Sequence, residues 1–166
     1  MNRVVIIGSG NLAEALARAL AAARGLQLVQ IHARNEERGR EVAHIAGCAW
    51  SGDPAALAPA DLYLIAVSDR AVAEVAERLP IPHGAAVAHT AGSVPMEAIP
   101  AKFARRGVFY PMQTFTKGRA VDFRPIPIFL EASTPELLAE LEEVAQRLSD
   151  RVIPADSERR SKIHLA

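Results

Sequence analysis

The sequence predicts an α/β fold with a doubly wound, mainly parallel sheet and helices on both faces. Strand-like and helix-like segments alternate through the first 90 residues, which implies right-handed crossovers between parallel strands. Strand-like segments such as residues 3–8 and 61–67 contain continuous apolar runs, as is typical of strands that are covered on both faces. The first of these runs leads into a glycine turn and then into an alanine-rich helical pattern, which is how folds of the Rossmann type open.

The first half of the chain is expected to hold five strands and three helices. Each strand is rich in β-branched or other apolar residues, and the five span residues 3–8, 26–32, 48–50, 61–67 and 85–89. The helices are expected at residues 11–24, at residues 36–46 and after Ser68 or Asp69 as N-cap. In the first helix Glu14 and Arg18 form an i, i+4 pair that should lie on the exposed edge.

The second half extends the sheet with shorter elements. Strands are expected at residues 107–110, 126–130 and 151–154. A helix is expected at residues 135–148, with Ser133 or Thr134 as its cap and Pro135 in its first turn. The final stretch begins like another helix, with Asp156 or Ser157 as its cap.

Composition limits the class of protein. With 166 residues the chain suits one domain with a sizeable core. Lys and Arg together number 19, as do Asp and Glu, so no net charge favours nucleic acid or an anionic membrane as a partner. Cys48 is the single cysteine, and we expect it to be a small buried residue. The sequence shows no signal peptide and no apolar run long enough to span a membrane, so we expect a cytoplasmic protein.

The glycine turn has the spelling GxGxxA, which by itself is a weak signal. Its context strengthens it, because Gly8 ends a predicted strand, Gly10 opens a predicted helix, and Ala13 is the small residue needed where helix and strand pack closely. Such a turn lets a pyrophosphate approach the free N–H groups of the helix N-terminus. The alternative is a turn that needs glycine only for packing.

The end of the second strand suggests which dinucleotide is bound. An NAD site usually has Asp or Glu there, which accepts a hydrogen bond from the ribose 2′-hydroxyl. This chain has Arg34, Asn35 and Arg38 instead, and Arg34 can pair with a 2′-phosphate in bidentate geometry. The sequence therefore favours NADP (NADPH) over NAD. Alternatively, Arg34 and Arg38 belong to a solvated helix start.

Three stretches resemble a known family: GSGNLAEALARAL, DLYLIAVSDRAVAEVAERL, and HTAGSVPMEAI followed by GVFYPMQTFTKGRAVDFRPIPIFLEAS. They resemble the Rossmann-like NADP oxidoreductases that carry the domain of unknown function 2520, and the most specific parts are residues 89–93 and 110–115. More distantly, the chain is similar to pyrroline-5-carboxylate reductases, ketopantoate reductases and prephenate dehydrogenases. The resemblance implies an NAD(P)-binding Rossmann-like domain at residues 1–154. Residues 155–166 would then begin a helix leading to a helical C-terminal domain, which usually mediates dimerisation.

The topology predicts where a ligand would lie, because ligands of open parallel sheets collect beyond the carboxyl ends of the strands. The residues expected to contact the cofactor follow the first, second, fourth and fifth strands: Gly8, Ser9, Gly10, Asn11, Leu12, Arg34, Asn35, Arg38, Val67, Ser68, Thr90, Ala91 and Gly92. The residues expected to line a polar substrate follow the fifth and sixth strands: Ser93, Tyr110, Met112, Gln113 and Thr114.

A carbonyl or imine that receives hydride also needs a proton. His89 is the titratable candidate at this edge, although a lone histidine at a strand end is more often a structural residue. The resemblance adds Lys162 and His164, because related reductases place catalytic Lys or His residues on the corresponding helix. The alternative for these two is a frayed basic tail. No residue spacing suggests a metal site, and no hydrolase motif is present.

The sequence as a whole predicts the cofactor half of an NADP-dependent oxidoreductase that acts on a small carbonyl, imine or hydroxy compound and forms a homodimer. A non-catalytic NADP-binding sensor or scaffold is the alternative from another class. A third reading is a Rossmann-like domain that binds another nucleotide through the same helix N-terminus.

Overall fold

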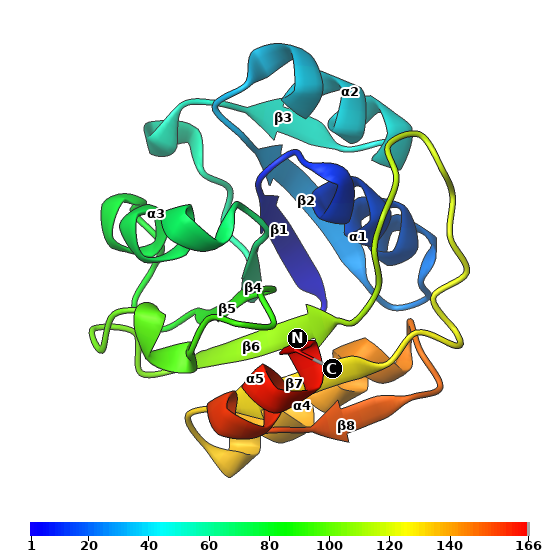
Figure 1. Cartoon of the computed structure of the whole chain (residues 1–166). Helices are drawn as coiled ribbons and strands as arrows, with labels where there is room; N and C mark the ends of the chain where they lie inside the picture. The colour runs from blue at the N-terminus through cyan, green and yellow to red at the C-terminus, as the bar shows by residue number, and fades with distance from the viewer. Residues whose placement is uncertain (166) are drawn as a thin grey trace.

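The computed structural model describes the backbone of residues 1–165 and the side chains of residues 1–163. An eight-stranded sheet has the order β3-β2-β1-β4-β5-β6-β7-β8, and every neighbouring pair is parallel except β6 with β7. The predicted doubly wound, mainly parallel α/β sheet is confirmed (Figure 1). The strands are β1 (Arg3–Ile7), β2 (Gln27–His32), β3 (Ala49–Ser51), β4 (Leu62–Ile65), β5 (Ala86–His89), β6 (Arg106–Pro111), β7 (Ile128–Ala132) and β8 (Val152–Pro154).

Helices cover both faces of the sheet because alternate residues of the central strands point to opposite sides. In β1, Val4 and Ile6 pack in one apolar cluster with α1, α2 and α4, whereas Val5 and Ile7 pack in a second cluster with α3. All four side chains are almost fully buried, as expected for a strand without a solvent face. The helices are α1 (Asn11–Ala22), α2 (Glu36–Ala46), α3 (Val72–Arg78), α4 (Pro135–Gln146) and α5 (Ser157–Leu165).

Strand register brings four chain segments to one edge of the sheet. Ile7 pairs with Ile65, Ile65 with His89, and His89 with Val108. The residues that follow β1, β4 and β5 therefore leave the sheet at the same level, and β6 ends close by at Pro111. This edge carries the glycine turn, as the sequence predicted.

One prediction about α1 is wrong. Glu14 does not lie on an exposed edge, because only 1% of its surface is exposed. Its carboxylate receives hydrogen bonds from Arg38 on α2 at 2.8 Å, from Arg18 at 3.2 Å and from the backbone N–H of Gly118 at 3.0 Å. Gly118 belongs to the long connection at residues 112–127, which runs beside α1 (Figure 1). Helical periodicity shows which residues share a face, but it does not show that a distant loop covers that face.

Several smaller expectations can be checked at the helix ends. Thr134 caps α4 by accepting the Leu137 N–H, and Asp156 accepts the Arg159 N–H at the start of α5. Ser68 makes no capping hydrogen bond, because a short 3-10 turn at Asp69–Ala71 precedes α3. Cys48 is half-buried rather than fully buried.

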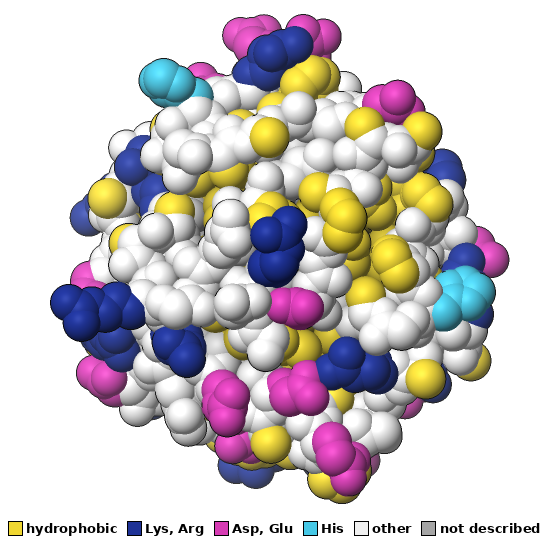
Figure 2. Space-filling model, turned by 180° about the vertical axis from the view of Figure 1, so that it is seen from behind, with side chains coloured by type: hydrophobic (Ala, Val, Ile, Leu, Met, Phe, Trp, Pro, Cys, Tyr) yellow, Lys and Arg dark blue, Asp and Glu magenta, His cyan; other side chains and the backbone are white. Residues whose placement is uncertain are grey.

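Charged side chains of both signs are interspersed on the face of the molecule that Figure 2 shows, with apolar groups between them. This distribution agrees with the balanced charge of the sequence. Within the part of the chain that the structure describes, no helix has the length and apolar character needed to cross a bilayer.

Candidate functional site

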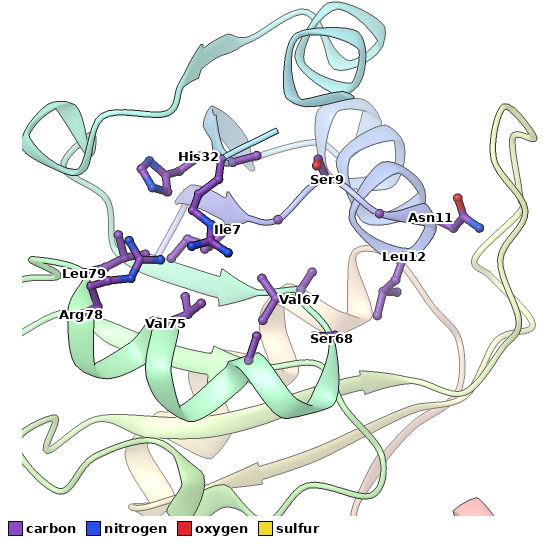
Figure 3. A pocket seen from close by; sticks show the side chains of 16 residues that line it. Ile7, Ser9, Asn11, Leu12, His32, Val67, Ser68, Val75, Arg78 and Leu79 are labelled. Carbon is purple, nitrogen blue, oxygen red and sulfur yellow. The ribbon is translucent and has the colours of Figure 1, made fainter. Parts of the chain in front are cut away.

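A cavity of about 400 Å³ opens at the edge of the sheet where β1, β2 and β4 end. Its walls come from the turn between β1 and α1, from the end of β2, and from the segment joining β4 to α3 (Figure 3). Eight of the residues predicted to contact a cofactor line it: Gly8, Ser9, Gly10, Asn11, Leu12, Arg34, Val67 and Ser68.

The two glycines of the turn have different roles. Gly8 adopts φ +126°, and a Cβ at this position would overlap the backbone carbonyl oxygen of Ala66. Gly10 is the N-cap of α1 and provides no side-chain hydrogen bond to the helix. A Cβ there would meet no protein atom within 4 Å, and Gly10 lines the cavity. Packing therefore requires glycine at position 8, whereas at position 10 the missing side chain leaves space for a ligand beside the helix N-terminus.

The end of β2 presents one of the three predicted polar residues to the cavity. Arg34 is exposed and lines it. Asn35 instead caps α2, accepting the N–H of Arg38 at 3.0 Å. The Arg38 guanidinium turns to Glu14 and Glu41, so neither Asn35 nor Arg38 lines the cavity. The expectation that these two residues contact a cofactor through their side chains is not supported by their placement.

Two basic residues of the cavity were missed by sequence reasoning. His32 is 2% exposed, and its Nδ1 atom has no hydrogen-bond partner. Burial, together with the positive charge of Arg78, lowers its pKa, so the ring is neutral near pH 7. Figure 3 shows His32 and Arg78 at one end of the cavity, with Asn11 and Ser68 towards the other. The signal for His32 was present, because it is the last residue of β2 and so lies at the carboxyl edge of the sheet, where ligands collect.

The charged residues that line the first cavity are all basic. Among the described residues that line this cavity there is no Asp or Glu, whereas Arg34 and Arg78 are both present. The helix N-terminus and two guanidinium groups therefore give the cavity a positive potential. The unpartnered His32 nitrogen is a further buried polar atom that a bound group could satisfy. The residues present thus fit an anionic dinucleotide.

A second cavity of about 390 Å³ lies beyond the ends of β5 and β6. Asp69 lines this second cavity, and its neighbour in the chain, Ser68, lines the first, so the two cavities adjoin. The Thr90 hydroxyl is used internally, because it donates to the Ile65 carbonyl at 3.0 Å. Ser93 is not part of the lining, and its hydroxyl donates to Asp69 at 3.0 Å. The predicted cofactor and substrate residues that meet here are Thr90, Ala91, Gly92, Tyr110, Met112, Gln113 and Thr114.

The geometry argues against proton transfer by His89. Its side chain is fully buried, its Nε2 donates to the Pro95 carbonyl at 3.1 Å, and its Nδ1 accepts the Ala91 N–H at 3.1 Å. Burial, with a smaller contribution from the nearby Arg160 charge, lowers the pKa of His89 to about 4. Both nitrogens are occupied and the ring is neutral, which is the structural alternative that the sequence left open.

The two remaining proton-donor candidates lie on α5. Lys162 lines neither cavity; its side chain is 77% exposed, and its ammonium lies 3.5 Å from Glu158. The side chain of His164 lies outside the described residues.

The chain matches the model of a known protein family. Residues 3–91 match the model described as "NADP oxidoreductase coenzyme F420-dependent". The chain belongs to this family. The matched region runs from β1 to the residues after β5, and so includes the glycine turn and the first cavity. No curated protein matches the chain significantly.

Several solved structures are similar over almost the whole chain. A Bacteroides fragilis protein, provisionally described as an NADP oxidoreductase, is 44% identical with a TM-score of 0.92, and the match covers 99% of this chain and 64% of that one. Aquifex aeolicus prephenate dehydrogenase, solved with NAD+ and hydroxyphenyl propionate, is 14% identical with a TM-score of 0.85 (98% and 63% covered). Synechocystis arogenate dehydrogenase is 19% identical with a TM-score of 0.81 (95% and 61% covered). At these low identities the two dehydrogenases show the fold alone. The chain spans less than two thirds of the length of each of these three proteins.

Proposed function

We propose that this chain is the cofactor-binding half of an NADP-dependent oxidoreductase, which transfers hydride to or from a small carbonyl, imine or hydroxy compound. One observation carries the proposal. The open glycine turn at the α1 N-terminus shares a cavity with Arg34, and no carboxylate stands among the described lining residues where an NAD site would have one.

In this proposal the adenosine and pyrophosphate part of the dinucleotide lies in the first cavity, and its nicotinamide end reaches the second. The backbone N–H groups that follow Gly10 would bind the pyrophosphate, and Arg34 would pair with the ribose 2′-phosphate. Val67 and Ser68 form the wall leading toward the second cavity, where Thr90–Gly92 would contact the nicotinamide end. When bound, NADPH supplies a hydride to an electrophilic carbon, and the oxygen or nitrogen attached to that carbon takes up a proton.

A non-catalytic NADP sensor is the second candidate. The placement of His89 favours it, because His89 was the residue predicted to transfer a proton at this edge of the sheet, and both of its ring nitrogens are already hydrogen-bonded within the protein. A screen for NADPH oxidation with small carbonyl and imine compounds distinguishes the two, because a sensor binds NADPH but does not consume it. The finer family assignment, to proteins carrying the domain of unknown function 2520, and the homodimer are parts of the same proposal. The resemblance of residues 89–93 and 110–115 supports that assignment.

The selective test of the cofactor is Arg34→Ala, measured by calorimetric titration with NADPH and NADH. We expect the parent chain to prefer NADPH by at least about tenfold. Arg34→Ala should weaken NADPH binding by about tenfold or more and change NADH binding by less than about threefold, because only NADPH has the 2′-phosphate. Arg24→Ala is the matched control, since Arg24 is exposed and lies outside the first cavity. Equal affinity of the parent for both compounds would contradict the NADP assignment.

A further inference from the structure

Arg160, in the first turns of α5, is buried more deeply than a guanidinium usually is. Its side chain is 1% exposed. One terminal nitrogen donates to the Glu131 carboxylate at 2.5 Å and to the Ala155 carbonyl at 3.3 Å, and the other donates to the Val94 carbonyl at 2.7 Å. The Nε atom has no partner. A buried ion pair adds little net stability compared with apolar residues of the same size. One role that such a pair can have instead is to hold neighbouring segments in a single conformation.

The backbone fixed by Arg160 continues directly into the second cavity. Val94 and Pro95 follow the lining residues Thr90–Gly92. The Val94 carbonyl is bound by Arg160 and the Pro95 carbonyl by His89, so two buried basic side chains hold two consecutive peptide groups. Arg160 comes from α5 and His89 from β5, and the segment is therefore held by two different elements of the fold.

A third contact joins the same segment to α5. The Met96 N–H donates to the Ser157 hydroxyl at 3.3 Å, and that hydroxyl donates to Glu131 at 2.9 Å. Glu131 thus accepts from both Ser157 and Arg160, which links the two contacts made by α5 into one network. At the other end, Thr90 is fixed by its bond to Ile65. Ala91, Gly92 and Ser93 lie between these anchors, and the first two of them line the cavity.

We propose that Arg160 is a positioning residue: from α5, with Glu131 and Ser157, it fixes Val94–Met96 and thereby the Thr90–Gly92 wall of the second cavity. The inference rests on the proposed function, because it takes that wall as the contact for the nicotinamide end of NADPH. It assigns to α5 a part in ligand binding although no described side chain of α5 lines either cavity. Arg160 therefore acts through backbone contacts, and the adenosine half of the ligand should not depend on it.

The test compares two ligands on the full chain by calorimetric titration: NADPH, which reaches both cavities, and 2′,5′-ADP, which carries only the adenosine half with its phosphates. Arg160→Met keeps the volume of the side chain and removes its hydrogen bonds. We expect this variant to bind NADPH about tenfold more weakly and 2′,5′-ADP within about twofold of the parent. Arg160→Lys should recover part of the loss, because its ammonium can still reach one carbonyl. Arg159→Met, on the exposed neighbour, should change neither affinity.

A gentler variant keeps the proposal testable if Arg160→Met does not fold. Ser157→Ala removes the acceptor of the Met96 N–H without unpairing a charge, and it should weaken NADPH binding alone by about threefold. Amide hydrogen exchange gives a readout without ligand, since the Met96 N–H should exchange faster in both variants while the core amides of β1 do not.

Each outcome supports or overturns the positioning role of Arg160. An equal loss for NADPH and 2′,5′-ADP would assign Arg160 a general structural role, and unchanged NADPH binding or unchanged Met96 exchange would also overturn the proposal. If the parent binds neither compound, the proposed function fails instead, and the exchange measurement still decides whether Arg160 holds the segment.

Discussion

The two cavities lie side by side at one edge of the sheet, but they are built in different ways. The first is lined by short segments that follow β1, β2 and β4, together with α3, all within the first 79 residues. The second combines residues after β4, β5 and β6, and its wall is held by contacts to α5 that join residues more than 60 positions apart. When a site is made from consecutive turns, its geometry is determined largely by the local sequence. When a site is made from segments far apart in the chain, its geometry depends on the completed fold.

This difference predicts that the two cavities respond differently to substitution. A side chain added at Gly10 in the glycine turn should weaken ligand binding directly and leave the fold intact. Changes around the second cavity should act through the network of buried polar groups, and should therefore appear first as changes in stability or in its pH dependence.

Gly10→Val is the largest expected effect and tests the local construction of the first cavity. The added side chain meets no protein atom near Cβ and projects where a phosphate would lie, so NADPH binding should weaken by about 100-fold or more with little change in the thermal midpoint. Titration and thermal unfolding of the same sample measure both quantities. Gly8→Ala is the contrasting variant, since φ +126° and the overlap with Ala66 should lower the midpoint itself. Unchanged NADPH affinity in Gly10→Val would rule out this turn as the phosphate site.

The pH dependence of folding tests the second cavity. The pKa of His89 is about 4 in the folded chain, below the ordinary value of 6.5, because the ring is buried. Between these two values the unfolded chain binds the additional proton, so the contribution of His89 is fully present above pH 6.5 and is lost as the pH falls toward 4. We expect the free energy of unfolding to decrease by about 2 to 3 kcal/mol over this range.

Urea titrations at several pH values measure this slope, and His89→Asn is the comparison. Asn keeps an acceptor for the Ala91 N–H but does not titrate, so the variant should show a shallower dependence than the parent. His32 also has a lowered pKa and leaves a residual slope in both chains. Parallel curves for parent and variant would mean that His89 is not held neutral by the fold.

Glu14→Gln is the smallest expected effect and tests the connection between the two regions. Glu14 on α1 holds Gly118 of the 112–127 connection, whose first residues line the second cavity. Burial alone would raise the pKa of Glu14, but the hydrogen bonds from Arg38, Arg18 and the Gly118 N–H together lower it. Removing the charge should lower the free energy of unfolding by about 2 kcal/mol, less than for a fully buried pair because both arginines are partly exposed.

The matched control for this variant is Glu41→Gln. Glu41 pairs with the same Arg38 but is 45% exposed, and its replacement should change stability by less than about 0.5 kcal/mol in urea denaturation. Equal effects of the two substitutions would show that the burial of Glu14 and its contacts with Arg18 and Gly118 add nothing to stability.

The fold could be predicted from the sequence where local patterns decide it. Strands β1 and β4 were predicted from continuous apolar runs, and α2 lies at its predicted bounds, where Asn35 caps it and Gly47 ends it. The covering of Glu14 could not be predicted, because it depends on a loop 104 residues away. The same limit applies to the site. Arg34 was found from its place after β2, whereas the burial of Arg160 depends on β7 and on the segment after β5, which meet only in the folded chain.

The two glycines of the opening turn also differ in the substitutions that related sequences could tolerate at each position. Gly8 is required by the protein's own backbone, so a descendant that lost its cofactor would still need it. Gly10 faces open space, and under the proposed function it is the bound ligand that forbids a side chain there. Among related sequences, a bulky residue at position 10 beside a retained glycine at position 8 would therefore mark a lineage that has given up the dinucleotide and kept the fold.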